Sequence, residues 1–210
     1  MDKTIIVEHP LIQDKLTRIR DAGTSSRDFR ALLKELSMLM AFEVTRDVKA
    51  EKTQVETPLE KASGVIVKDS DIVLITILRA GIGMADGVIE VIPQARVGHI
   101  GIYRDPDTLE AIEYYHKTPS NISNCQMVII IDPMLATGHT VVATLNICRD
   151  LGAKNIKIMC LVAAPEGIKE VRKYYKDVLI YTAAMDEKLN DHGYILPGLG
   201  DAGDRIFGTK

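Results

Sequence analysis

Apolar positions follow two different periods along this chain of 210 residues. Between residues 26 and 42 they recur every three or four positions, which predicts an amphipathic helix with Ser26 as its N-cap. A shorter helix is expected to begin near Pro10. The segment 48–61 alternates between apolar and polar residues and is typical of a strand or hairpin. The first part of the chain is therefore predicted to be mainly helical.

Beyond residue 70 the pattern changes to short, continuous apolar runs. They begin at Ile72, Val97, Met127, Ile156 and Val178. Their length and β-branched content are typical of strands buried on both faces of a sheet. Helical stretches separate several of them, notably 140–151 and 165–176. The alternation predicts one α/β domain over residues 1–210, in which helices flank a central parallel sheet and the helical segment 10–46 packs on the domain or between subunits.

The composition is that of an ordinary globular chain, with 46% apolar and 26% charged residues. Lys and Arg number 26 against 29 Asp and Glu, a net charge of -3, so no basic field attracts a phosphate backbone and no nucleic acid partner is expected. No apolar run approaches the ~20 residues of a membrane span, and the amino terminus lacks a secretory signal. Three separated cysteines without a CxxC pair favour reduced thiols, so we expect a cytoplasmic protein without membrane partners.

In a parallel sheet the ligand crevice lies at the carboxyl ends of the strands, so the loops after the apolar runs are the candidates for chemistry. The loop within 77–87 is similar to a dinucleotide fingerprint, but Asp86 stands where the third glycine is required. What remains is Arg79 beside a glycine-rich turn, Ala80 and Gly81, whose backbone amides suit a polyanion such as pyrophosphate. The alternative is a turn arginine paired with a surface carboxylate.

A second loop, 102–119, places Arg104 just beyond a strand, before a long polar and partly aromatic excursion. Long excursions in compact domains often cover a binding site, so this segment is predicted to be a lid. The alternative is a solvated hairpin whose tyrosines cover the edge of the sheet. The sequence pattern alone leaves both interpretations open.

The third loop is the most informative, because Asp132 ends a buried strand and Thr137, Gly138, His139 and Thr140 open a helix. Free amides at a helix N-terminus, with a glycine that permits close approach, form a cradle for phosphate. No GxxxxGK[ST] motif is present, so a P-loop nucleotidase is disfavoured. A carboxylate accepts hydrogen bonds from two ribose hydroxyls, so the loop predicts a ribose 5-phosphate site. The alternative is an ordinary turn with a capping acid.

The tail, residues 193–208, contains five glycines. Glycine in that number weakens regular structure and suits a backbone that approaches a flat ligand closely, beside Asp201 and Asp204. The alternative is a flexible terminus. Apolar residues interleave with the glycines and would be costly if exposed, so a structured binding loop is the favoured interpretation.

The motif DPMLATGHT at 132–140 and the tail GYILPGLGDAGDRIFGTK resemble the signatures of the uracil phosphoribosyltransferases, a branch of the type I phosphoribosyltransferases. The resemblance continues through HPLIQDKL, FRALLKEL, ILRAGIGMADG, GIYRDPDTLE, VAAPEG and LNDHGY, and spans essentially the whole chain. It implies the type I phosphoribosyltransferase-like α/β fold, with a β-arm or lid excursion and a Gly-rich C-terminal base-binding segment. It further implies Mg²⁺-dependent transfer of the 5-phosphoribosyl group of phosphoribosyl pyrophosphate to N1 of uracil, giving UMP and pyrophosphate.

The resemblance also implies roles for particular residues. Phosphoribosyl pyrophosphate would be bound by Arg79, Ala80, Gly81, Arg104, Asp132, Pro133, Met134, Leu135, Ala136, Thr137, Gly138, His139, Thr140 and Asp201. Uracil would be bound by Tyr194, Ile195, Gly200, Asp201 and Ala202. Asp201 and Arg104 would act in catalysis. Because Pro133 supplies no second carboxylate, Mg²⁺ is expected to bind through substrate oxygens and water, near Asp201, rather than through a set of protein ligands.

One position departs from the pattern, since His139 stands where the resembling loop usually has glycine, and its imidazole could donate to the 5-phosphate. Allosteric activation by GTP and assembly into a homodimer or homotetramer are implied by the resemblance alone. Two other functions are alternatives: transfer to another nucleobase, and a non-catalytic or RNA-binding regulator on the same fold. The Gly-rich tail argues against the first, and the net charge of -3 offers no support for the second.

Overall fold

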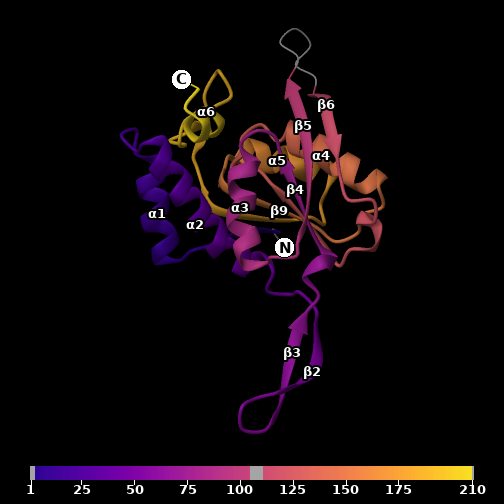
Figure 1. Cartoon of the computed structure of the whole chain (residues 1–210). Coiled ribbons are helices and arrows are strands. Elements are labelled where there is room, and N and C mark those ends of the chain that lie inside the picture. The colour runs from indigo at the N-terminus through magenta and orange to yellow at the C-terminus, as the bar shows by residue number, and fades with distance from the viewer. Residues whose placement is uncertain (1–2, 105–110, 210) are drawn as a thin grey trace.

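The computed structural model describes residues 3–104 and 111–209 (Figure 1). Its helices are α1 (Pro10–Arg20), α2 (Ser26–Val44), α3 (Gly81–Val91), α4 (His139–Asp150), α5 (Pro165–Tyr174) and α6 (Ala202–Phe207). Its strands are β1 (Thr4–Ile6), β2 (Ala50–Glu56), β3 (Lys61–Val67), β4 (Ile72–Ile77), β5 (Arg96–Arg104), β6 (Ala111–Lys117), β7 (Met127–Ile131), β8 (Met134–Leu135), β9 (Ile156–Ala163), β10 (Leu179–Met185), β11 (Lys188–Leu189) and β12 (Ile195–Leu196).

The main sheet confirms the predicted α/β class. Its strand order is β1-β10-β9-β7-β4-β5-β6, and β8 pairs with β9. Neighbouring strands are parallel except β5 and β6, which form an antiparallel hairpin. All five apolar runs are strands of this sheet. The edge strand β1 was not predicted, because its three residues are too few to form a pattern.

The central strands are apolar at most positions because helices cover both faces of the sheet. In β7, Met127, Ile129 and Ile131 pack in one core with residues of α1, α2 and α3. The alternate residues Val128 and Ile130 pack in a second core with α4 and α5. The alternation along a strand sends successive side chains to opposite faces. Two cores therefore hold the sheet in a fixed position beneath its strand-end loops.

The helices predicted before residue 45 are confirmed, but the N-cap of α2 is Ser25 and not Ser26. The Ser25 hydroxyl accepts a hydrogen bond from the Asp28 amide, 3.1 Å away. The turn expected after Arg79 continues as a helix, α3. A Cβ at Gly87 would lie 2.3 Å from the Lys34 carbonyl oxygen, and one at Gly83 would lie 2.7 Å from a methyl carbon of Leu33, so these two glycines allow α3 to pack closely against α2. Packing against α2 thus explains two glycines of the loop segment 77–87.

Two hairpins project from opposite ends of the body (Figure 1). The β2–β3 hairpin, which we call the arm, agrees with the hairpin expected from residue 48. The β5–β6 hairpin rises beside the carboxyl ends of the strands. The ring centres of Tyr103 in β5 and Tyr114 in β6 lie 6.2 Å apart. The middle of the predicted lid, 105–110, lies outside the described residues, so the lid stays a prediction. Among the described helices, none is long and apolar enough to cross a membrane.

Candidate active site

The first and third predicted site loops meet at one edge of the sheet. Strands β4 and β7 are parallel neighbours, with Thr76 opposite Ile131, so the loops after them begin side by side. A Cβ at Gly81 would lie 2.5 Å from the Ile131 carbonyl oxygen. Glycine is therefore required where α3 starts, and it brings the turn of Arg79 and Ala80 against the loop that carries Asp132. The Arg79 side chain is about half exposed, at 53%.

The predicted phosphate cradle, residues 136–140, is held on β9 by backbone hydrogen bonds. The Pro133 carbonyl accepts from the amides of Leu161 and Val162, at 3.0 and 3.2 Å. The next two residues, Met134 and Leu135, form β8. The chain then passes Ala136, Thr137 and Gly138, which has a φ of +84°, and enters α4 at His139, one residue before the predicted start at Thr140. The amides of the first turn of α4 thus open toward the loop, as anion binding requires.

Asp132, the residue predicted to bind the ribose hydroxyls, lies directly after β7. Burial raises the pKa of its carboxyl group from 3.8 to about 7, and a hydrogen bond from the Met134 amide, 3.3 Å away, opposes this rise only partly. The carboxyl group therefore changes charge close to neutral pH. A group that is poised in this way at the edge of a cradle is typical of a functional site.

The tail is ordered, so the flexible-terminus alternative is wrong. Strands β11 and β12 pair through Leu189 and Ile195, and the Asn190 side chain accepts from the Tyr194 amide at 2.9 Å. The tail then forms α6, although its glycines predicted no helix. Gly198 and Gly200 precede α6 and Gly208 follows it, all with positive φ, so the glycines shape the turns around the helix rather than weaken it.

The predicted uracil residues surround the start of α6. Tyr194 is 44% exposed, Ile195 is buried in β12, and Gly200 has a φ of +77°. Asp201 is the N-cap of α6, where its carboxylate accepts from the Asp204 amide at 2.8 Å, and Ala202 is the first residue of the helix. A hollow of about 420 Å³ is lined by Tyr194, Gly200, Asp201, Asp204, Arg205 and, from the loop between α1 and α2 and the first residue of α2, Ala22, Thr24 and Ser26.

Sequence analysis did not predict two arginine contacts that hold the C-terminal segment against α1. Arg20 donates both terminal nitrogens to Asp186, at 2.6 and 2.8 Å, and Asp186 also accepts from the Gly198 amide at 2.9 Å. Arg205 donates to the carbonyls of Ile19 and Leu199, at 2.7 and 2.9 Å. Asp186 and Arg205 each lie more than 160 positions along the chain from the residue of α1 that they contact. No local pattern could have paired them.

The tail joins both strand-end loops. The Arg79 guanidinium lies 3.3 Å from the Asp204 carboxylate and 5.7 Å from the centre of the Phe207 ring. A Cβ at Gly193 would lie 3.7 Å from the methyl group of Thr137 in the cradle. The structure thus brings Arg79, Asp132, the cradle and the tail to one place. Arg104 lies at the end of β5, and because its side chain is not among those described, its role stays a prediction.

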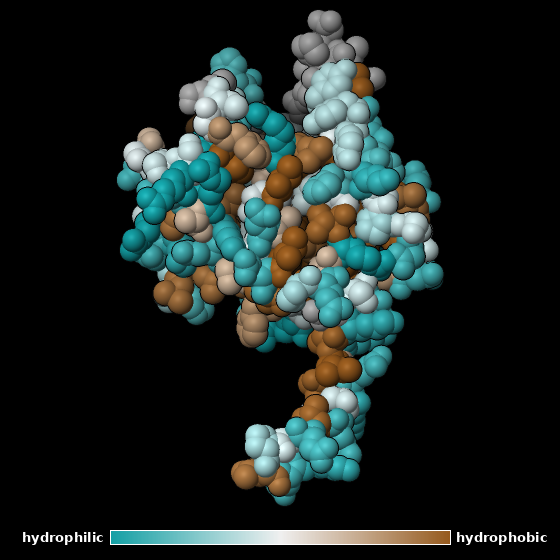
Figure 2. Space-filling view, viewed as in Figure 1, coloured by the Kyte–Doolittle hydropathy of each residue, from teal (hydrophilic) through white to brown (hydrophobic). Residues whose placement is uncertain are grey.

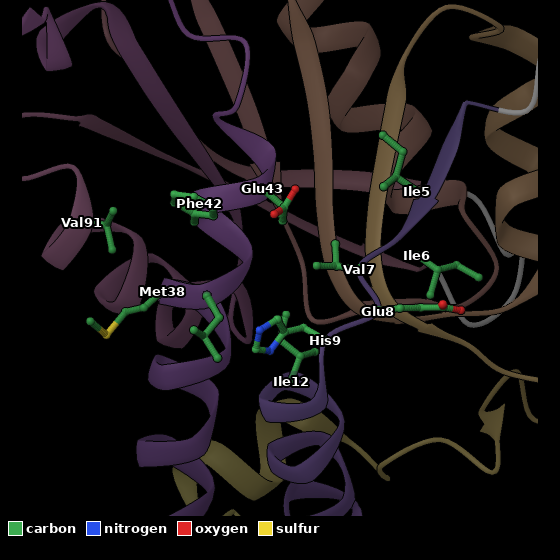
Figure 3. A pocket seen from close by; sticks show the side chains of 11 residues that line it. Ile5, Ile6, Val7, Glu8, His9, Ile12, Met38, Phe42, Glu43 and Val91 are labelled. Atoms are coloured by element: carbon green, nitrogen blue, oxygen red, sulfur yellow. The ribbon is translucent and has the colours of Figure 1, made fainter. Parts of the chain in front are cut away.

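A separate groove of about 690 Å³ lies between β1, α1, α2 and the end of α3 (Figure 3). It is lined mainly by apolar side chains, with His9, Glu8 and Glu43 as its polar members. The lining contains neither Lys nor Arg and includes no residue of the strand-end loops. A groove of this composition does not suit a phosphorylated substrate, so the strand ends are the candidate active site.

The residues present fit a Mg²⁺ ion that is held mainly by a substrate. Among the described residues, no three His, Cys, Asp or Glu side chains gather around one metal position. Asp201 and Asp204 line the hollow of the tail. Mg²⁺ commonly uses one or two carboxylates together with substrate phosphates and water, so two acidic side chains are compatible with it.

Comparison with known proteins agrees with this geometry. The family model described as "Uracil phosphoribosyltransferase" matches residues 6–209. The chain belongs to the uracil phosphoribosyltransferase family. It is 55% identical to the uracil phosphoribosyltransferase of Geobacillus sp. (strain WCH70), over 100% of both chains. The structure of the AQ2163 protein from Aquifex aeolicus superposes with a TM-score of 0.92 at 37% identity, over 99% of each chain.

The wider fold of this uracil phosphoribosyltransferase family member is also confirmed. The adenine phosphoribosyltransferase of Trypanosoma brucei superposes with a TM-score of 0.58 at 13% identity, covering 92% of this chain and 88% of that one. At that identity the likeness is one of fold. It confirms the type I phosphoribosyltransferase architecture that the sequence motifs implied.

Proposed function

We infer that the protein transfers the 5-phosphoribosyl group of phosphoribosyl pyrophosphate to uracil, giving UMP and pyrophosphate, in pyrimidine salvage. The observation that carries this function is the junction of the Asp132 loop and the phosphate cradle with the tail, in a chain that matches the uracil phosphoribosyltransferase family over residues 6–209. The family match favours this enzyme over a transferase for another base and over a regulator.

The geometry supports a site in which different residues bind the 5-phosphate, the ribose and the pyrophosphate of the substrate. The cradle, from Ala136 to Thr140, binds the 5-phosphate through the free amides of α4, and the preceding Pro133, Met134 and Leu135 hold the cradle on β9. Asp132 accepts hydrogen bonds from the ribose hydroxyls. Arg79, the amides of Ala80 and Gly81, and Arg104 neutralise the pyrophosphate. Displacement at the anomeric carbon needs no covalent nucleophile, so positioning and stabilisation of the leaving charge supply most of the catalysis.

Uracil binds at the tail, between Tyr194 and the start of α6. Backbone groups of Ile195, Gly200 and Ala202 read its edges, and Asp201 lies between the base and the ribose. Donors and acceptors in fixed positions reject cytosine, because its amino group meets a donor where a carbonyl is expected. The positive φ of Gly200 supports this proposal, since it turns the backbone at the hollow without a side chain.

Mg²⁺ is part of the proposal, bound through substrate oxygens and water near Asp201. When bound, it polarises the leaving pyrophosphate. A cytoplasmic location is also proposed, and the three free thiols, Cys125, Cys148 and Cys160, support a reducing compartment. GTP is proposed as an allosteric activator on the resemblance alone.

A homodimer or homotetramer is the proposed assembly, and the arm supports it. The arm projects away from the body and carries apolar side chains in the open (Figure 2). Leu59 at its tip is 95% exposed and Val65 is 67% exposed. Exposed apolar surface of this kind is typical of a segment that contacts another chain.

A base panel tests the proposed function. The purified protein is incubated with Mg²⁺, phosphoribosyl pyrophosphate and, separately, uracil, cytosine, orotate, hypoxanthine or guanine, with and without GTP, and nucleotide and pyrophosphate are measured. UMP from uracil alone is the expected result. Turnover of another base, or tight binding of phosphoribosyl pyrophosphate without any product, would contradict it.

His139 is expected to strengthen binding of phosphoribosyl pyrophosphate modestly, by about threefold, through an imidazole donor to the 5-phosphate. His139 is about half exposed, and its Nε2 lies 3.9 Å from the Glu170 carboxylate, which also pairs with Lys173. We predict that His139→Gly raises the KM for phosphoribosyl pyrophosphate. The measurement is the ratio of variant to wild-type KM for phosphoribosyl pyrophosphate, with the KM for uracil as the control. A ratio of one would remove the imidazole from the site.

A further inference from the structure

The first turn of α5 lies between the cradle and the tail. The helix begins at Pro165, directly after β9. The residue before it, Ala164, donates its amide to the Leu135 carbonyl at 2.9 Å, so the start of α5 is tied to β8 and the approach to the cradle. The two residues after Pro165 contact different parts of the candidate active site: Glu166 contacts the tail and Gly167 contacts the cradle.

Gly167 contacts the cradle through its backbone. A Cβ at Gly167 would lie 2.4 Å from the carbonyl oxygen of Ala136 and 2.8 Å from that of Leu135. From the other side, a Cβ at Gly138 would lie 2.6 Å from the Gly167 carbonyl oxygen. Backbone atoms cannot move aside as a flexible side chain can, so both glycines are required for this approach. The turn of the cradle before α4 therefore rests on the first turn of α5.

Glu166 contacts the tail through its side chain. Its Oε1 accepts a hydrogen bond from the Leu189 amide at 3.0 Å, and this bond holds the pKa of the carboxyl group below its ordinary value. Leu189 pairs with Ile195 across β11 and β12. Ile195 is one of the residues proposed to bind uracil. One hydrogen bond thus connects α5 to the strand pair that carries the base-binding segment.

We infer that Glu166 and Gly167 are positioning residues for the transfer reaction, which set the distance between the bound ribose phosphate and the bound uracil. The inference rests on the proposed function and on its assignment of the two substrates to the cradle and the tail. Reacting atoms must approach to roughly 3–3.5 Å, so a small shift of one site against the other slows transfer. Because α5 touches the cradle by backbone and the tail by a side chain, the two contacts can be altered separately.

The tail contact is tested with Glu166→Ala and Glu166→Gln, and with Lys169→Ala as a control on an exposed residue of the same helix. Glu166→Ala removes the acceptor for the Leu189 amide, so the base-binding segment shifts against the cradle. We expect the KM for uracil to rise about fivefold and kcat to fall about fivefold, while the KM for phosphoribosyl pyrophosphate stays within about twofold. Glu166→Gln keeps a carbonyl acceptor and should restore the KM for uracil to within about twofold of the wild type. An unchanged KM for uracil in Glu166→Ala would overturn the inference. Equal impairment in both variants would overturn it too, because the charge in the first turn of the helix would then be responsible.

The cradle contact is tested with Gly167→Ala, whose Cβ pushes the cradle away from α5. The KM for phosphoribosyl pyrophosphate should rise about tenfold, with a smaller change for uracil. Circular dichroism and thermal unfolding show whether this variant folds, and if it does not, the two Glu166 variants decide the question. Wild type and Lys169→Ala are assayed in parallel. A failed inference then appears as active protein with unchanged KM values in Glu166→Ala, whereas a failed proposed function appears as no UMP from any protein and would overturn the inference as well.

Discussion

Asp132→Asn is expected to lose about 100-fold in kcat/KM for phosphoribosyl pyrophosphate, because a hydrogen bond to a charged group contributes roughly 1.5–3 kcal/mol and the carboxylate accepts two from the ribose. The same change should stabilise the protein above neutral pH. The neutral amide keeps the size of the side chain and an acceptor for the Met134 amide, so the fold is expected to persist. Loss of activity together with a gain in thermal stability is a combination that simple unfolding cannot produce.

The sign of the stability change follows from the pKa of Asp132. The folded protein holds the proton up to about pH 7, whereas the unfolded chain releases it near 3.8. Between these values the unfolded state binds fewer protons, so this group lowers stability progressively as the pH rises, and its full penalty is present above pH 7. The asparagine side chain does not titrate, so the Asp132→Asn protein avoids this penalty. The Tm of the variant should exceed that of the wild type by roughly 5 °C at pH 8 and by little at pH 4, as measured by calorimetry.

Activity should respond to pH in the opposite direction. The ionised carboxylate is the better acceptor for ribose hydroxyls, so kcat/KM for phosphoribosyl pyrophosphate should rise by about fivefold from pH 6 to 7 and level off above pH 8. The substrate itself also titrates, and Asp132→Asn serves as the control because its residual activity keeps only the substrate's dependence. Equal pH profiles for the two proteins would contradict the role of Asp132.

Arg79→Ala should be the second severe variant, with a loss of about 100-fold in kcat/KM, because a preorganised cation stabilises the pyrophosphate as it leaves. Arg79→Lys keeps the charge but not the two-pronged geometry, and should recover only part of the activity. Pyrophosphate release in the steady state measures both. The pair also shows whether charge alone or the planar guanidinium is needed at this turn.

Two control variants separate this effect from the contacts of Arg79 with the tail. Phe207→Leu removes the ring that lies 5.7 Å from the guanidinium without changing any charge, and should alter kcat/KM by less than about threefold. Arg18→Ala removes an arginine from an exposed pair on α1 and should have no effect. If Phe207→Leu were as inactive as Arg79→Ala, Arg79 would be holding α6 in place rather than binding the leaving group.

Sequence analysis found the elements whose formation depends on neighbours along the chain. The buried strands were predictable because each is a short apolar run covered on both faces. The cradle was predictable because the glycine and the helix start are adjacent in sequence. Lys157 was not expected to be buried within such a run. It is 1% exposed, since its side chain reaches the end of α2, where it donates to the Val44 carbonyl at 2.7 Å and pairs with Asp47.

By itself, the sequence determined the α/β class, the order of strands and helices along the chain, and the residue types available to bind phosphate and ribose. Local periodicity and turn chemistry carry that information. Only the tertiary structure decided that the glycines after Arg79 belong to a helix packed on α2, that the Gly-rich tail contains α6, and that Arg20 holds Asp186. Each of these depends on a contact between segments far apart in sequence, where the close approach of two backbones or the burial of an ion pair, rather than local preference, selects the conformation.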